Sequence, residues 1–78
     1  MKVEVKYFGA IAEWAGCQQV QLDFDGINVS DLINMLEKQI SGLNSTSYQV
    51  AINHVIANDD QVISLGDEIA FLPPFAGG

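Results

Sequence analysis

Cysteine, histidine and basic residues are scarce in this chain of 78 residues. The single cysteine, Cys17, rules out an internal disulfide and is typical of a reducing, cytoplasmic setting. Three Lys or Arg against ten Asp or Glu give a net charge of −7, which argues against nucleic acid or an anionic membrane as partner. The acidity is compatible with docking onto basic proteins, although it would serve solubility equally well.

Long apolar runs and enzyme-like motifs are also missing. No apolar run approaches the roughly 20 residues that cross a bilayer, and the first residues do not resemble a signal peptide. The lone His54 falls in a predicted turn, where a solvated side chain is the usual outcome. Cys17 begins an apolar segment, which predicts a buried, unreactive thiol. Without metal-ligand spacing, a phosphate loop or a serine triad, the pattern favours a carrier or binding domain with no metal over an enzyme.

Alternating polar and apolar residues predict a protein built largely on strands. Apolar residues make up 49% of the chain, which is enough for the core of one domain. A short helix over residues 10–15 is predicted to end at Gly16, and Asn53-His54 is predicted to be a hairpin turn. The predicted strands cover residues 2–8, 17–24, 49–53, 55–56 and 68–72.

A longer amphipathic helix is predicted between Ser30, as its N-cap, and Gly42. Its apolar residues recur at helical spacing, so we expect them to cover the sheet. They are Leu32, Ile33, Leu36 and Ile40. We interpret residues 43–48 as a polar loop and residues 62–65 as an irregular apolar stretch. The order of elements predicts an α+β fold, with one main helix on a single face of a mixed sheet and the first and last strands adjacent in its middle.

The last six residues differ from the rest of the chain. Two prolines end the final strand and stiffen the residues after it, and six extended residues span at most roughly 20 Å. We therefore predict a domain over residues 1–72 and an extended tail over residues 73–78. Such a slim end could enter a tight channel and have its carboxylate activated, for instance as an acyl-adenylate, although glycine is also common at frayed ends. The tail residues are Pro73, Pro74, Phe75, Ala76, Gly77 and Gly78.

The C-terminal third of the chain resembles the small subunit of molybdopterin synthase. The motif that carries the resemblance is Gly66-Asp67-Glu68-Ile69-Ala70-Phe71-Leu72-Pro73-Pro74 followed by Gly77-Gly78. The opening also matches, in Val5-Lys6-Tyr7-Phe8-Gly9-Ala10 and Glu13-Trp14-Ala15-Gly16, with weaker support between residues 18 and 48. The resemblance implies the ubiquitin-like β-grasp fold.

The resemblance also implies a role as a sulfur carrier that is not itself a catalyst. An E1-like activating enzyme would adenylate Gly78 with ATP, and a persulfide donor would convert its carboxylate to a thiocarboxylate, a 1-thioglycine. Gly78 would then donate sulfur to precursor Z, the cyclic pyranopterin monophosphate, to form the dithiolene of molybdopterin. No cofactor would stay bound to the carrier, and ATP would be consumed by the activating enzyme.

The implied partner is the large catalytic subunit, in a heterotetramer of two small and two large subunits. The family's apolar contact positions fall here on Phe8, Ile56, Leu72 and Phe75. Three alternatives stay open. They are a sulfur carrier for thiamine or tRNA thiolation, a protein modifier joined to lysines through Gly78, and a β-grasp binding module with an inert tail. The Leu72-Pro73-Pro74-Phe75 segment favours molybdopterin synthesis.

Overall fold

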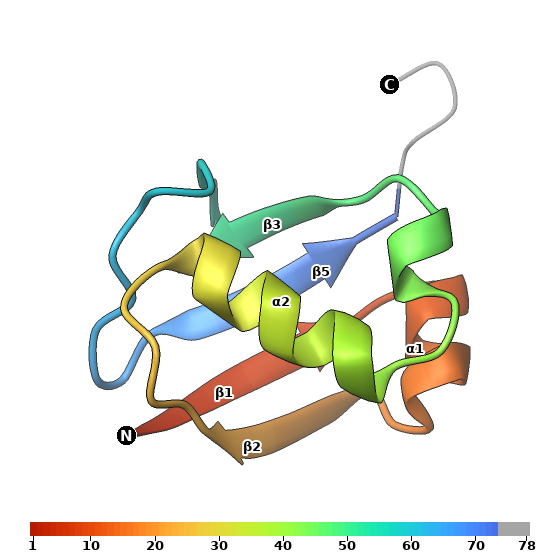
Figure 1. The fold of residues 1–78 in the computed structure, drawn as a ribbon, viewed down its shortest axis with the longest axis horizontal. Coiled ribbons are helices and arrows are strands. Elements are labelled where there is room, and N and C mark those ends of the chain that lie inside the picture. Colours follow the sequence, from red (N-terminus) through yellow and green to blue (C-terminus); the bar gives the residue numbers. More distant parts are fainter. Residues whose placement is uncertain (74–78) are drawn as a thin grey trace.

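The computed structural model describes residues 1–73, which form two layers, a mixed sheet and a helix across one of its faces (Figure 1). The strand order is β2-β1-β5-β3-β4, and α2 lies across the sheet. In chain order the elements are β1 Lys2–Tyr7, α1 Ala10–Ala15, β2 Gln19–Asp23, α2 Val29–Gln39, the 3₁₀-helix η1 Leu43–Ser45, β3 Gln49–Ile52, β4 Val55–Ile56 and β5 Glu68–Leu72. The predicted α+β architecture is confirmed.

The first and last strands lie side by side in the middle of the sheet, as predicted. β1 and β5 run parallel, with Tyr7 opposite Phe71, and β3 pairs antiparallel with the other edge of β5. Because side chains alternate along a strand, one face of β1 and one face of β5 are apolar and buried, whereas β3 buries three consecutive residues and both residues of β4 are exposed. The buried apolar residues are Val3, Val5, Tyr7, Ile11, Phe24, Val29, Leu32, Leu36, Ile40, Leu43, Val50, Ala51, Ile52, Ile63, Ile69 and Phe71.

The start of α2 differs from the prediction. Asn28, and not Ser30, is the N-cap, since Asn28 has an extended backbone and its side chain accepts a hydrogen bond from the Asp31 backbone N–H at 3.0 Å. The Asp31 carboxylate in turn accepts from the Asn28 N–H at 3.3 Å. This reciprocal pair satisfies two N–H groups that the helix would otherwise leave unpaired. Ser30 therefore lies within the first turn of the helix.

Several of the connections between elements agree with the predictions made from the sequence, and two differ from them. Gly16 has the predicted left-handed backbone, and Asn53 and His54 have φ angles of 52° and 72°, which a tight hairpin turn of type I′ requires. The loop over residues 43–48 is not simply polar, because η1 buries Leu43 completely. In the apolar stretch over residues 62–65 only Ile63 is buried, while its two exposed apolar neighbours are Val62 and Leu65.

Candidate docking face

Two of the residues expected to contact a partner lie next to each other where the last strand ends. Tyr7 and Phe71 are paired in the β1–β5 register and are buried on the helix side of the sheet. Leu72 follows Phe71 as the last residue of β5, so alternation places its side chain on the opposite, open face, and Phe8 follows Tyr7 directly after the end of β1. Phe8 is 44% exposed and Leu72 is half-buried. Because the register ends at Tyr7 opposite Phe71, these two apolar residues follow at the same end of the sheet.

The third expected contact residue, Ile56, lies on the same face at the edge of the sheet. It pairs with Ala51, which pairs with Ala70, which in turn pairs with Lys6. Ala51 is 4% exposed and Ala70 is half-buried, so between Ile56, which is 54% exposed, and β1 the accessible surface comes from Ala70. We call this surface the docking face; it comprises Phe8, Ile56, Ala70 and Leu72, with Ala51 buried beneath it. No pattern in the sequence indicated the two alanines, because their positions depend on strand register.

The base of the tail is fixed beside Phe8. Gly9 has a φ of +60°, and a Cβ atom added there would come within 3.1 Å of the Pro73 Cγ atom. Gly9 is therefore needed both for its backbone conformation and for the close approach of Pro73. Residues 74–78 lie outside the described residues, so the predictions for Pro74, Phe75, Ala76, Gly77 and Gly78 stay predictions.

The end of the docking face away from the tail is polar. The Lys6 ammonium lies 3.4 Å from the Glu68 carboxylate, and the His54 imidazole lies 3.7 Å from the same carboxylate. The Asn53 amide bridges two residues, donating to the Asp67 carboxylate at 3.0 Å and accepting from the Glu68 N–H at 3.0 Å. His54 is 83% exposed, as predicted. The face thus has an apolar end beside the tail and a charged end beside the hairpin turn.

Cys17 differs from its prediction. It is half-buried and not buried, because β2 begins only at Gln19 and leaves Cys17 in the turn after α1. Its neighbour Tyr7 is almost fully buried, and burial, with a smaller contribution from Cys17, raises the pKa of the Tyr7 hydroxyl to about 12.

Within residues 1–73, no group of three His, Cys, Asp or Glu side chains is placed to hold a metal ion. None of the helices in this part of the chain is long and apolar enough to cross a membrane.

Known proteins resemble this chain over its whole length. A model of the ThiS family matches residues 5–78. The molybdopterin synthase sulfur carrier subunit of Mycobacterium tuberculosis is 35% identical over 85 residues, covering 100% of this chain and 99% of that protein. SAMP1 of Haloferax volcanii has a TM-score of 0.82 at 30% identity, with 100% of both chains covered.

A further solved structure is a complex of subunits 1 and 2 of the molybdopterin-converting factor from Helicobacter pylori. One of its chains has a TM-score of 0.72 at 27% identity, and both chains are covered completely. The likenesses confirm both the resemblance seen in the sequence and the ubiquitin-like β-grasp fold. This chain belongs to the ThiS family, among relatives named molybdopterin synthase sulfur carrier subunits.

Proposed function

We propose that this protein is the sulfur carrier subunit of a molybdopterin synthase and acts in the cytoplasm as a donor, not as a catalyst. The observation that carries the proposal is the full-length match to a relative of that name, together with the family match that extends to Gly78. The docking face supports it, because an apolar surface beside the base of the tail would let a partner hold the domain while receiving its end.

The chemistry would take place at the Gly78 carboxyl carbon. A carboxylate is a poor electrophile, so an E1-like enzyme would first join a carboxylate oxygen to the α-phosphate of ATP, with pyrophosphate leaving. The terminal sulfur of a persulfide would then attack the carbonyl carbon, and AMP would leave. A thiol would reduce the resulting S–S bond and release the thiocarboxylate, a 1-thioglycine. This sulfur would pass to precursor Z, the cyclic pyranopterin monophosphate, with no cofactor held by the carrier itself.

The partner in the last step would be the large catalytic subunit, in an assembly of two small and two large subunits. Phe8, Ile56 and Leu72 would form the apolar contact on the domain, and Phe75 would extend it along the tail. Residues 73–78 would occupy a channel that leads to the pterin. The contact between Gly9 and Pro73 supports this division, because it fixes the start of the tail next to Phe8.

A second candidate is a protein modifier. It is favoured by the likeness to SAMP1 of Haloferax volcanii, a protein named small archaeal modifier protein 1. A modifier would use the same adenylate but would transfer the Gly78 acyl group to a lysine amine. Carriers for thiamine or tRNA thiolation would share the thiocarboxylate and differ only in the acceptor.

The test is to incubate the purified protein with the activating enzyme, ATP and a persulfide source, and to measure its intact mass. Exchange of one oxygen for sulfur at Gly78 is expected, followed by molybdopterin formation when the large subunit and precursor Z are added. If the thiocarboxylate forms but the large subunit cannot use it, the result would support a carrier in another thiolation pathway. Attachment to lysines would support the modifier, and an unchanged mass would leave only a binding module.

A further inference from the structure

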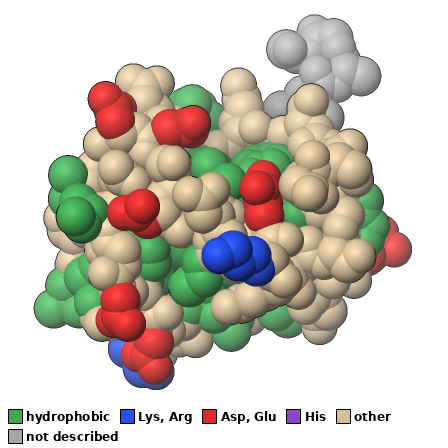
Figure 2. All heavy atoms as spheres, viewed as in Figure 1, with side chains coloured by type: hydrophobic (Ala, Val, Ile, Leu, Met, Phe, Trp, Pro, Cys, Tyr) green, Lys and Arg blue, Asp and Glu red, His purple; other side chains and the backbone are tan. Residues whose placement is uncertain are grey.

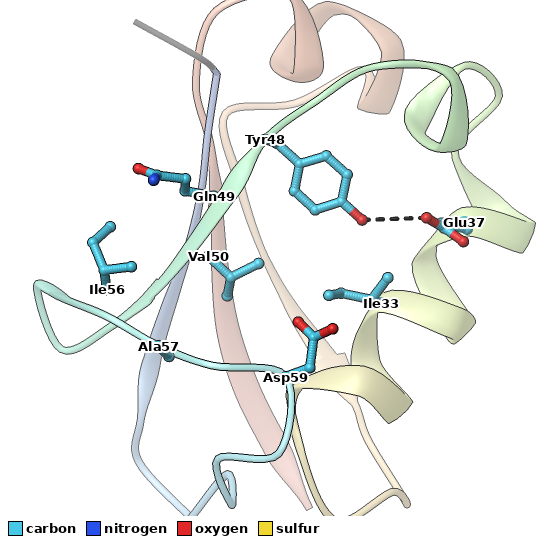
Figure 3. Close-up of a pocket in the computed structure, with 8 residues that line it drawn as sticks. All are labelled: Ile33, Glu37, Tyr48, Gln49, Val50, Ile56, Ala57 and Asp59. Atoms are coloured by element: carbon cyan, nitrogen blue, oxygen red, sulfur yellow. Dashed lines mark hydrogen bonds between the residues drawn. The ribbon is translucent and has the colours of Figure 1, made fainter. Parts of the chain in front are cut away.

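We propose that a hollow between α2 and β3 receives an arginine side chain from the protein that docks on the neighbouring docking face. This proposal depends on the proposed function in one respect, which is that the docking protein is the large subunit. The hollow has a volume of about 440 Å³ and lies on the helix side of β3 (Figure 3). It is lined by apolar residues, Ile33, Val50 and Ala57, and by polar residues, Glu37, Tyr48 and Asp59.

Three segments that are distant in sequence build this hollow. Glu37 and Ile33 come from α2, Tyr48 precedes β3, and Asp59 lies in the loop after β4. In Figure 3 the side chains of Tyr48, Ile33 and Asp59 point toward one shared space, with Glu37 beside the tyrosine hydroxyl. Glu37 is half-buried and Asp59 is exposed, so solvent reaches the two residues to different degrees.

The hollow is negatively charged. The Tyr48 hydroxyl donates a hydrogen bond to the Glu37 Oε2 atom at 3.3 Å. Burial, followed by the charge and hydrogen bond of Glu37 and the charge of Asp59, raises the pKa of Tyr48 to about 12. Neither carboxylate has an ion-pair partner among residues 1–73, where the three ion pairs involve only Asp23 and Glu68 as acids.

The surroundings add to this charge. Figure 2 shows acidic side chains spread over the face that carries α2, with few basic side chains among them. Among the described residues, no lysine and no histidine lines the hollow. A cation entering it would therefore meet two carboxylates that lack an ion-pair partner in the described part of the chain.

An arginine side chain fits this combination of surfaces. Its aliphatic stem can pack on Ile33, Val50 and Ala57, while its charged head stays at the mouth of the hollow. The planar guanidinium can stack on the Tyr48 ring and donate to carboxylates on two sides, which a lysine ammonium does less well. A hydrated metal ion is a poorer fit, since no group of three His, Cys, Asp or Glu side chains within residues 1–73 is placed to hold one.

The hollow and the docking face meet at the edge of the sheet. Gln49 and Ile56 complete the rim of the hollow, and their side chains point away from it, to the other side of β3 (Figure 3). Ile56 is thus shared between the two surfaces. Because β4 contains only two residues, the edge between them is short. A protein on the docking face could reach around this edge and place one arginine in the hollow.

The first test uses a small probe and needs no partner. N-acetyl-arginine amide is titrated into the labelled protein and amide chemical shifts are recorded, with N-acetyl-citrulline amide as the neutral control of the same shape. We expect shifts clustered at Ile33, Tyr48, Val50 and Asp59 with the arginine probe alone. They should be lost in the double variant Glu37→Gln/Asp59→Asn. Shifts spread evenly over all the acidic residues would overturn the proposal.

The second test measures binding of the large subunit to the full-length protein. Glu37→Gln/Asp59→Asn should weaken the complex by about tenfold, because two partly exposed charge contacts are lost. The matched control, Asp25→Asn/Asp60→Asn, changes the net charge equally outside the hollow and should leave affinity within about twofold. Equal weakening by both variants, or by neither, would overturn the arginine contact while leaving the proposed function intact. Failure of the wild-type protein to bind would instead contradict the proposed function, and the probe titration would still decide the arginine site.

Discussion

The two faces of the central strands differ in what covers them. On the helix side Val5, Ile69 and Phe71 are completely buried beneath α2. On the other side their direct neighbours Ala70 and Leu72 stay partly exposed. Because side chains alternate along a strand, neighbouring residues of one strand contribute to opposite faces of the sheet. One face is closed within the chain, and the other keeps apolar residues that are partly exposed.

This difference separates folding from docking. Substitutions on the helix side remove contacts that the unfolded chain lacks, so they change the free energy of unfolding. Substitutions on the docking face remove little that the isolated domain needs, and they should change mainly the affinity for a partner. If the two faces are independent, substitutions on the helix side should change the free energy of unfolding without changing affinity, and substitutions on the docking face should do the reverse.

The largest effect is expected at the end of the chain, outside both faces. Deleting Gly78 should abolish sulfur transfer completely, because the carbon that would carry sulfur is then displaced by one residue from the activating enzyme's site. The unfolding midpoint should not change, since β5 ends at Leu72. The measurement is molybdopterin formation in the reconstituted reaction, beside a thermal unfolding curve. Normal activity in the shortened protein would contradict the assignment of Gly78.

The helix side of the sheet should respond through stability alone. Leu36 is 1% exposed, and Leu36→Ala should lower the free energy of unfolding by about 2–5 kcal/mol. Gln39→Ala, at an exposed position of the same helix, should change it by less than about 0.5 kcal/mol. Denaturant unfolding measures both. A loss near zero for Leu36→Ala would mean that the apolar stripe of α2 does not form the core.

The docking face should respond through affinity alone. Phe8→Ala should weaken binding to the large subunit by about 2 kcal/mol, as expected for an aromatic anchor, with little change in unfolding. Trp14→Ala is the matched control, since Trp14 is exposed to a similar extent, 42% against 44%, but packs near Gly42 on the helix side. Phe75→Ala should weaken binding by a similar amount. An unchanged dissociation constant for Phe8→Ala would remove Phe8 from the interface.

Local patterns in the sequence predicted the elements well, because strand alternation and helical spacing depend on near neighbours. They failed where two local signals competed, as at the start of α2. Ser30 and Asn28 are both good N-caps, and the reciprocal hydrogen bonds between Asn28 and Asp31 are found at Asn28. The buried thiol predicted for Cys17 failed for a similar reason, since the boundary of a strand is the least certain part of its pattern.

Surfaces that join distant segments could not be predicted. The docking face requires Ala51 to pair with Ala70, and strand register is set by the whole sheet. The hollow beside Tyr48 depends on α2 and on the loop that carries Asp59, and no spacing in the sequence relates them. The hairpin turn between β3 and β4 is the opposite case, since Asn53 and His54 are adjacent and their backbone preference is local.

Substitutions in this turn are expected to have the smallest effect on the free energy of unfolding. His54 has a φ of 72°, in the left-handed region that strains a residue with a Cβ atom, and its side chain is 83% exposed. His54→Gly should relieve that strain and stabilise the domain by about 0.5 kcal/mol after the added flexibility of the unfolded chain is subtracted. His54→Ala keeps the Cβ atom and should not stabilise. Denaturant unfolding compares the two, and a glycine variant no more stable than the alanine variant would show that the turn is not strained at His54.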